Sequence, residues 1–264
     1  SAAPKKAASK KAVKEKSAEQ YIEIHFLIRF HTEYGQTLSI VGNHALFGDN
    51  QPEKGLQLSY LNNEYWQGQI SIPQNEIPAE PITYNYVLTD KDGSYVYDWG
   101  SDKQLDFSGF TKNKISIYDS WNHAGYFENV FYTEPFNNVL LAQEYTSVKA
   151  SSASKTTTHT FRVKAPLLKK GEVLCIAGAD KQLTAWNTEA PLFMTRKKDQ
   201  NYWELSVNLN NARFPLEYKY GVYNIEEKRF VQYESGNNRL LYQQPDKDRF
   251  TIVNDGFAIL PNNT

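Results

Sequence analysis

The stretch YIEIHFLIRF, Tyr21–Phe30, decides the fold class because its apolar and polar residues alternate. A period of two residues is typical of a β-strand that buries one face. Further short apolar runs follow at Thr37–Gly42, Tyr65–Ile72, Ile82–Leu88 and Lys114–Tyr118. Turn residues such as the pair Asp92-Gly93 separate these runs, and no long amphipathic helix stands out. This half of the chain is therefore predicted to be a β-sandwich.

The second half of the chain repeats the first at a nearly constant distance. Gly42 and Gly178, Asn50 and Trp186, and Asp119 and Asp255 each lie 136 residues apart, and Trp66 and Trp203 lie 137 apart. An offset held this closely across a whole module is hard to obtain by chance. We interpret the sequence as two copies of one β-sandwich.

The repeat and the composition shifts along the chain suggest five segments. Residues 1–19 contain six lysines and no aromatic residue, which predicts a basic flexible tail. The first domain covers 20–133 and the second covers 158–258. Between them, 134–157 forms a connection whose Ser, Thr and Ala residues from about 150 to 157 predict a flexible linker. The last residues, 259–264, follow the second domain.

The composition excludes several classes of function. The 264 residues carry a formal net charge of −1, which argues against a general nucleic-acid binder. No apolar run of transmembrane length and no signal peptide are evident, so we expect no membrane partner and a cytoplasmic location. The single cysteine, Cys175, excludes an internal disulfide and a Cys-rich metal site. Aromatic residues make up 14% of the sequence, which is more than the core needs. Some of these rings are therefore available for a binding surface.

Catalysis has no positive support in the sequence. There is no nucleophile motif, phosphate-binding loop or dinucleotide fingerprint. The histidines His25, His31, His44, His123 and His159 are scattered and do not have metal-ligand spacing. Carboxylates are plentiful, but none lies in a recognisable glycosidase arrangement. We therefore expect a non-catalytic chain with no metal and no cofactor.

One group of residues in the second copy suggests a sugar site. Trp186 lies in a loop between polar residues, where an indole ring is a candidate platform for the C–H face of a sugar, although core packing is an equal alternative. Lys219, Glu234 and Asn238 offer hydrogen-bonding groups for hydroxyls. Core packing is the expected role of three other aromatic residues of this copy, Trp203, Tyr218 and Tyr220.

These stretches together resemble a known family. GEVLCIAGADKQLTAWN (171–187), YWELSVNL (202–209), FPLEYKYGV (214–222) and VQYESGNNR (231–239) are similar in order and spacing to the starch-binding domain, carbohydrate-binding module family 20. The resemblance implies an immunoglobulin-like antiparallel β-sandwich that binds α-1,4-glucans. It places the first sugar site at Trp186, Tyr233 and Lys219, with Glu234 and Asn238 in the turn. The family's second site is in doubt because its strand aromatic falls at Cys175.

The first copy departs from the family at its site. Asn50 stands where the loop tryptophan is expected, and Asn85 stands where the lysine is expected. A standard first site is therefore not expected in this copy. Tyr97, Trp99 and Tyr60 remain candidates for a weaker, remodelled sugar surface; a spacer or packing domain is the alternative.

Two such modules in tandem resemble the front of a disproportionating 4-α-glucanotransferase of glycoside hydrolase family 77. That resemblance implies that the chain holds starch, glycogen or malto-oligosaccharide for a catalytic domain of the same polypeptide that is absent here. It also implies that 259–264 form the lead-in to that domain. Three alternatives remain open: a self-contained glucan-binding protein, a tandem immunoglobulin-like module that binds another protein and no sugar, and an enzyme with a novel site in the aromatic-rich first half.

Overall fold

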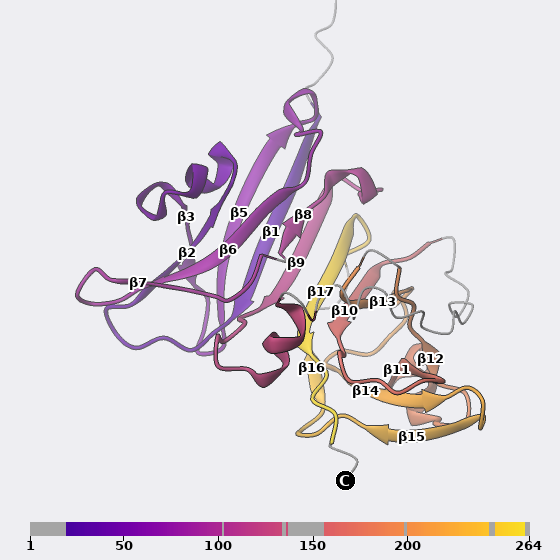
Figure 1. The fold of residues 1–264 in the computed structure, drawn as a ribbon. Coiled ribbons are helices and arrows are strands. Elements are labelled where there is room, and N and C mark those ends of the chain that lie inside the picture. Colours follow the sequence, from indigo (N-terminus) through magenta and orange to yellow (C-terminus); the bar gives the residue numbers. More distant parts are fainter. Residues whose placement is uncertain are drawn as a thin grey trace, which may run out of the picture.

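The computed structural model describes residues 20–101, 103–133, 136, 156–197, 200–242 and 246–261, and these form two modules built from strands (Figure 1). The strands of module 1 are β1 (Tyr21–Arg29), β2 (Thr37–Gly42), β3 (Leu56–Gln57), β4 (Ser59–Tyr60), β5 (Tyr65–Pro73), β6 (Ile82–Thr89), β7 (Tyr95–Tyr97), β8 (Gln104–Leu105) and β9 (Lys114–Ser120). The strands of module 2 are β10 (His159–Lys164), β11 (Glu172–Gly178), β12 (Leu192–Phe193), β13 (Trp203–Val207), β14 (Leu216–Asn224), β15 (Arg229–Tyr233), β16 (Arg239–Leu241) and β17 (Arg249–Phe257).

The described helices are short 3-10 turns in the connections between strands. They are η1 (Ala45–Asn50), η2 (Pro52–Lys54), η3 (Gln74–Glu76), η4 (Phe107–Gly109), η5 (Phe127–Tyr132) and η6 (Lys181–Trp186). No helix in the described part of the chain is both long enough and apolar enough to cross a membrane. The predicted all-β class, with immunoglobulin-like sandwiches, is confirmed.

Each module has a hydrophobic core between two sheets. In module 1, β1 contributes Ile24, Phe26 and Ile28, which are completely buried, as its alternating sequence predicts. In module 2, Phe161, Trp203 and Tyr220 belong to a separate cluster of buried side chains. The prediction of core positions for Trp203, Tyr218 and Tyr220 is confirmed, since they are at most 2% exposed.

The repeated glycines mark a close approach between strands in each module. A Cβ atom on Gly42 would lie 2.5 Å from the carbonyl oxygen of Thr83, and one on Gly178 would lie 2.5 Å from that of Glu217. Both distances are far shorter than van der Waals contact. The 136-residue spacing of the two glycines therefore records the same steric requirement in both modules.

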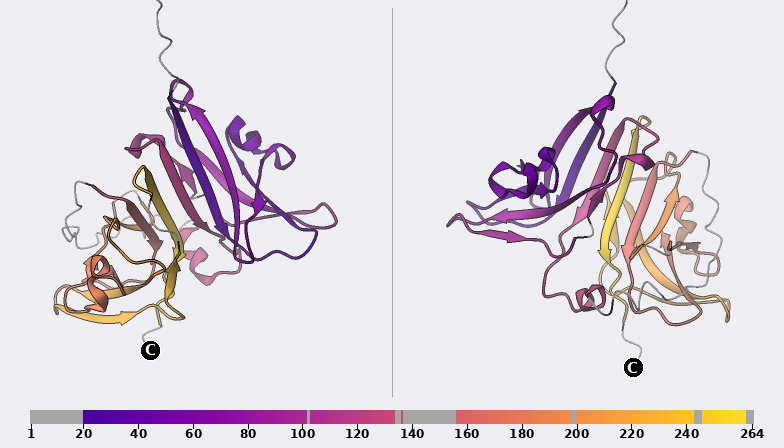
Figure 2. Two further views of the ribbon diagram at one scale, coloured as in Figure 1. Left: turned by 180° about the vertical axis from the view of Figure 1, so that it is seen from behind. Right: turned by 45° about the horizontal axis from the view of Figure 1, so that its top comes forward.

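The two modules share one continuous seven-stranded sheet, in the order β13-β10-β17-β9-β1-β5-β4 (Figures 1 and 2). Its centre is a parallel pairing of β9 with β17, from Lys114 opposite Arg249 to Tyr118 opposite Val253. The sandwiches are thus mixed rather than purely antiparallel, because β1 with β9 and β10 with β17 are parallel as well. The proposed connection, 134–157, falls mostly outside the described residues.

The two five-stranded sheets cover opposite faces of this shared sheet. Paired residues on neighbouring strands point to the same face. Ile117 and Ile252 are paired and both belong to the core of module 1, whereas Val253, paired with Tyr118, belongs to the core of module 2. An approximate two-fold axis along the strands, between β9 and β17, would produce this arrangement. The face of β17, β10 and β13 that is turned away from the core of module 2 is consequently left without a second sheet.

Candidate functional site

The loop that ends in Trp186 has an unusual backbone. Asp180 caps η6 by accepting a hydrogen bond from the backbone N–H of Gln182, at 3.0 Å. Thr184, Ala185 and Trp186 then follow with φ values of 71°, 48° and 61°, in the left-handed region that residues with a Cβ atom rarely adopt. Each such residue costs on the order of 1–3 kcal/mol, and such strain concentrates at functional sites. The loop presents the partly exposed indole of Trp186 at the surface.

The ring of Tyr233 lies beside that of Trp186. The two ring centroids are 6.1 Å apart and the ring planes meet at 85°. Tyr233 is the last residue of β15 and is partly exposed. Phe230 of the same strand packs against it, with 4.6 Å between the two ring centroids. We call Trp186 and Tyr233 the aromatic platform of module 2.

Lys219 is fixed next to this platform by the turn that follows β15. Its Nζ donates hydrogen bonds to the carbonyl oxygens of Glu234, at 3.1 Å, and Gly236, at 2.6 Å. An ammonium group has three N–H donors, so one is left for a ligand. Asn238, exposed in the same turn, donates its side-chain N–H to Glu217 at 3.0 Å, which leaves its amide oxygen as an acceptor.

Glu234 has a different place from the other predicted site residues. The residue is only 4% exposed. Its carboxylate accepts a hydrogen bond from the backbone N–H of Tyr220 at 3.0 Å and two from the guanidinium of Arg239 at 2.8 and 2.9 Å. The carboxylate is therefore occupied beneath the turn. Glu234 can hold the turn in position but does not present a group to a ligand at the platform.

A buried polar network supports the turn from below. The hydroxyl groups of Tyr218 and Tyr220 both donate to Oδ2 of Asp255, at 2.8 and 2.7 Å, and burial raises the pKa of both tyrosines well above the ordinary value. Arg239 also packs over the ring of Tyr220. Burial alone would lower the pKa of Arg239, but Asp255 and Glu234 raise it. The platform thus rests on side chains whose positions are fixed by several partners each.

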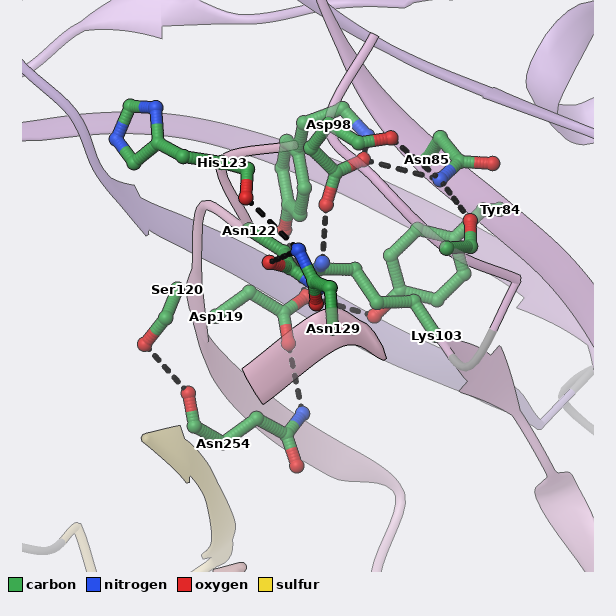
Figure 3. Close-up of polar contacts among 12 residues, drawn as sticks. Tyr84, Asn85, Asp98, Lys103, Asp119, Ser120, Asn122, His123, Asn129 and Asn254 are labelled. Atoms are coloured by element: carbon green, nitrogen blue, oxygen red, sulfur yellow. Dashed lines mark hydrogen bonds and ion pairs between the residues drawn. The ribbon is translucent and has the colours of Figure 1, made fainter. Parts of the chain in front are cut away.

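Module 1 contains the same scaffold without the indole (Figure 3). Asn50 has φ 62°, as Trp186 has 61°, and Asn85 donates to the carbonyl oxygens of Asp98 and Gly100, at 3.2 and 2.8 Å. Asp98 is paired with Lys103, as Glu234 is with Arg239. Burial raises the pKa of the Asp98 carboxyl, against the opposing effect of Lys103. The site position in module 1 therefore lacks only the stacking ring and the cationic head of Lys219.

The three aromatic candidates of module 1 lie on three different elements. Tyr60 is on β4, at the outer edge of the seven-stranded sheet, and its ring packs edge-on against Trp66. Tyr97 is on β7 of the five-stranded sheet and is 46% exposed. Trp99 lines a groove between the modules. Among the described residues no ring contact joins any two of the three.

That groove is the feature that sequence analysis missed. It has a volume of about 1590 Å³ and is lined by residues of both modules, from Arg29 to Ile259. No local motif indicates it, because it depends on how β9 and β17 pair. Within the described residues, no group of three or more histidine, cysteine or acidic side chains is arranged to hold a metal ion.

Comparison with known proteins agrees with the repeat. The starch binding domain family matches residues 21–115 and again 156–251. Over 252 residues, 89% of this chain, the sequence is 25% identical to 4-alpha-glucanotransferase DPE2 of Oryza sativa subsp. japonica, of which it covers 26%. Over 109 residues, 40% of this chain, it is 27% identical to a glucoamylase of Neurospora crassa, of which it covers 17%. The chain thus spans about a quarter or less of the length of these relatives.

Among solved structures, the family 20 module of a maltotetraose-forming amylase from Pseudomonas saccharophila is similar over 36% of this chain and 97% of its own, with 19% identity and a TM-score of 0.30. A glucoamylase from Hypocrea jecorina is similar over 40% of this chain and 18% of its own, with 18% identity and a TM-score of 0.35. The two family matches together span more than half of the sequence. The chain belongs to the starch binding domain family and carries two copies of that domain in tandem.

Proposed function

We propose that the chain binds α-1,4-glucans, as starch, glycogen or malto-oligosaccharide, chiefly through the aromatic platform of module 2. The observation that carries this proposal is the aromatic platform, where the loop that ends in Trp186 places an indole beside Tyr233 at the surface. The same left-handed backbone in module 1 ends in Asn50 and presents no ring, so the ring distinguishes the binding module. Family membership identifies the ligand as an α-glucan.

The geometry of the platform suits a sugar chain. Each glucosyl unit has an apolar face of C–H groups that packs on a π-face, and hydroxyls around its edge. Two rings set at 85° can contact consecutive units of a chain that bends, as an α-1,4-linked chain does. Lys219 and Asn238 lie where they can donate to and accept from the hydroxyl groups of the bound chain.

The proposed role is non-catalytic. Glycoside cleavage or transfer needs two carboxyl groups on either side of an open site. The buried carboxylates Asp98 and Glu234 are engaged by cations, and Asp119 and Asp255 accept hydrogen bonds from buried tyrosines. Binding by this chain would instead raise the local concentration of glucan near a separate active site.

We further propose that this active site belongs to the same polypeptide, a 4-α-glucanotransferase. Support comes from the match to the rice enzyme, which runs through both modules and covers 89% of this chain. A cytoplasmic location is part of the proposal, and Cys175, buried as a free thiol, is compatible with a reducing compartment.

Calorimetric titration with β-cyclodextrin and maltoheptaose tests the proposal. Trp186→Ala should weaken binding roughly ten- to a hundredfold, because a stacking ring is worth about 1–3 kcal/mol. Tyr34→Ala removes a ring that is 98% exposed in a loop of module 1 and serves as the control. If the wild-type chain binds neither ligand, or if folded Trp186→Ala binds as tightly as wild type, the assignment is wrong.

A further inference from the structure

The groove between the modules follows from the offset arrangement of the sheets. Its floor is the face of β17, β10 and β13 that no second sheet covers, and includes Asn254, Arg162 and Glu204. One wall is formed by module 1, through residues of the segments 99–101, 103–111 and 120–133. The other wall is the segment that precedes β13 in module 2, with Lys197 and 200–202. We call this feature the junction groove.

Direct contacts between the modules hold the two walls at a fixed separation. Asn254 donates a hydrogen bond to Oδ1 of Asp119 at 2.7 Å, and Ser120 donates to the carbonyl oxygen of Asn254 at 2.8 Å (Figure 3). The hydroxyl of Tyr132 in module 1 donates to the carbonyl oxygen of Asn201 in module 2 at 3.3 Å. The groove is therefore formed before any ligand arrives, which lowers the entropic cost of binding.

Partly exposed aromatic rings come from both walls. Tyr202 lies on the side of module 2, with the guanidinium of Arg162 5.2 Å from its ring centroid. Burial raises the pKa of Tyr202 against the opposing effect of Arg162. Phe110 lines the opposite wall. Because Tyr132 of one wall contacts Asn201 of the other, both rings border the same groove.

Most of the charged groups of the groove are engaged by other groups of the protein. Glu204 pairs with both Arg162 at 3.4 Å and Lys197 at 3.3 Å. Lys103 pairs with Asp98, and Arg239 with Glu234, while Lys164 lies over the rings of Tyr132 and Phe257. Because these cations are already engaged, the groove favours a neutral ligand over a phosphate, a nucleic acid or a strongly charged peptide.

One buried polar atom in the groove lacks a hydrogen-bond partner. It is Oε1 of Gln200, an acceptor, which makes no hydrogen bond within the described structure. An unmade buried hydrogen bond costs about 1–3 kcal/mol. A hydroxyl group can donate to this oxygen, so a polyhydroxylated ligand can satisfy it.

We propose that the junction groove is a second glucan-binding site, built jointly by the two modules, which takes a stretch of linear α-glucan chain. The inference rests on the proposed function for the choice of sugar. Aromatic rings on both walls, ion-paired charges and an unpaired buried acceptor are features that a neutral sugar chain can use. The volume of about 1590 Å³ exceeds the roughly 300–1,000 Å³ of small-ligand pockets and suits several linked units.

Variants of the two walls test the groove separately from the platform. Tyr202→Ala and Phe110→Ala remove a ring from each side, and Tyr34→Ala is the matched control. Each is made alone and together with Trp186→Ala, and all are titrated with linear maltodextrin and with β-cyclodextrin. We expect Trp186→Ala to keep measurable affinity for the linear chain and to weaken β-cyclodextrin binding more strongly than maltodextrin binding. Adding either wall substitution should then weaken maltodextrin binding about threefold to tenfold.

Hydrogen exchange on the wild-type chain gives a readout that requires no substitution. Maltodextrin should slow exchange in residues 103–111 and 200–206, besides the platform. If the wild-type chain binds no glucan, the proposed function fails together with the groove. If glucan binds but Trp186→Ala abolishes all binding, or if the groove segments gain no protection, the platform stands and the groove proposal is overturned.

Discussion

Replacing Asn50 with tryptophan is expected to give module 1 a glucan site of its own. The backbone is prepared for it, because Asn50 has φ 62° where Trp186 has 61°. Tyr97, 46% exposed, stands at the place of Tyr233, and Asn85 contacts the turn carbonyls as Lys219 does. The missing indole is the main difference between the two positions.

The magnitude follows from two separate effects of the substitution. Asparagine tolerates the left-handed region better than tryptophan, so folding stability should fall by about 1–2 kcal/mol. A domain with 5–15 kcal/mol of stability survives this loss. The added ring should contribute about 1–3 kcal/mol to binding, which is roughly a five- to hundredfold gain in affinity for module 1.

The assay measures β-cyclodextrin binding, and the variant also carries Trp186→Ala so that the platform of module 2 contributes little to binding. Calorimetry should show one site for the Asn50→Trp/Trp186→Ala chain and much weaker binding for Trp186→Ala alone. Asn50→Leu changes the same backbone position without supplying a ring and should restore nothing. A folded Asn50→Trp/Trp186→Ala chain that binds no better than Trp186→Ala would refute the reasoning that the loop scaffold presents the ring.

Other predictions concern stability and reactivity. Burial raises the pKa of Cys175 to about 12, so a thiol reagent at pH 8 should label it only after unfolding. Burial lowers the pKa of His159 to about 4. The unfolded chain therefore takes up a proton as the pH falls from about 6.5 to 4, while the folded chain does not. Over this range the free energy of unfolding in urea should fall by about 3 kcal/mol, and His159→Gln should lack this fall. Asp255→Ala leaves two buried tyrosine hydroxyls unpaired and should cost about 3–5 kcal/mol in urea unfolding, whereas the exposed Asp246→Ala should cost almost nothing.

The repeat in the sequence has a structural counterpart in each module. The pairs Tyr84 with Tyr86 and Tyr218 with Tyr220 both donate to one aspartate, Asp119 or Asp255. These tyrosines are predictable as core because they share one face of a strand. Their common aspartate is not predictable from local pattern, since about 35 residues separate it from them.

Glu234 shows why a motif position does not specify a role. The resemblance to the family places it in the binding turn, and the structure turns its carboxylate inward to Arg239 and to the backbone of Tyr220. Whether a side chain in a turn faces the ligand or the core depends on which buried partners lie within reach. Arg239 directly follows the turn at the start of β16, but the backbone N–H of Tyr220 belongs to β14, which lies earlier in the chain.

The sequence alone determined the β-class, the two copies and the family, because alternation and a constant repeat offset are local or one-dimensional properties. It also identified the residues that became the aromatic platform. Only the tertiary structure decided that β9 and β17 pair in parallel and join the modules into one sheet. Strand pairing at an edge depends on backbone hydrogen bonds that every residue except proline can make, so composition does not specify it. The junction groove exists because of that pairing and therefore could not be found from the sequence.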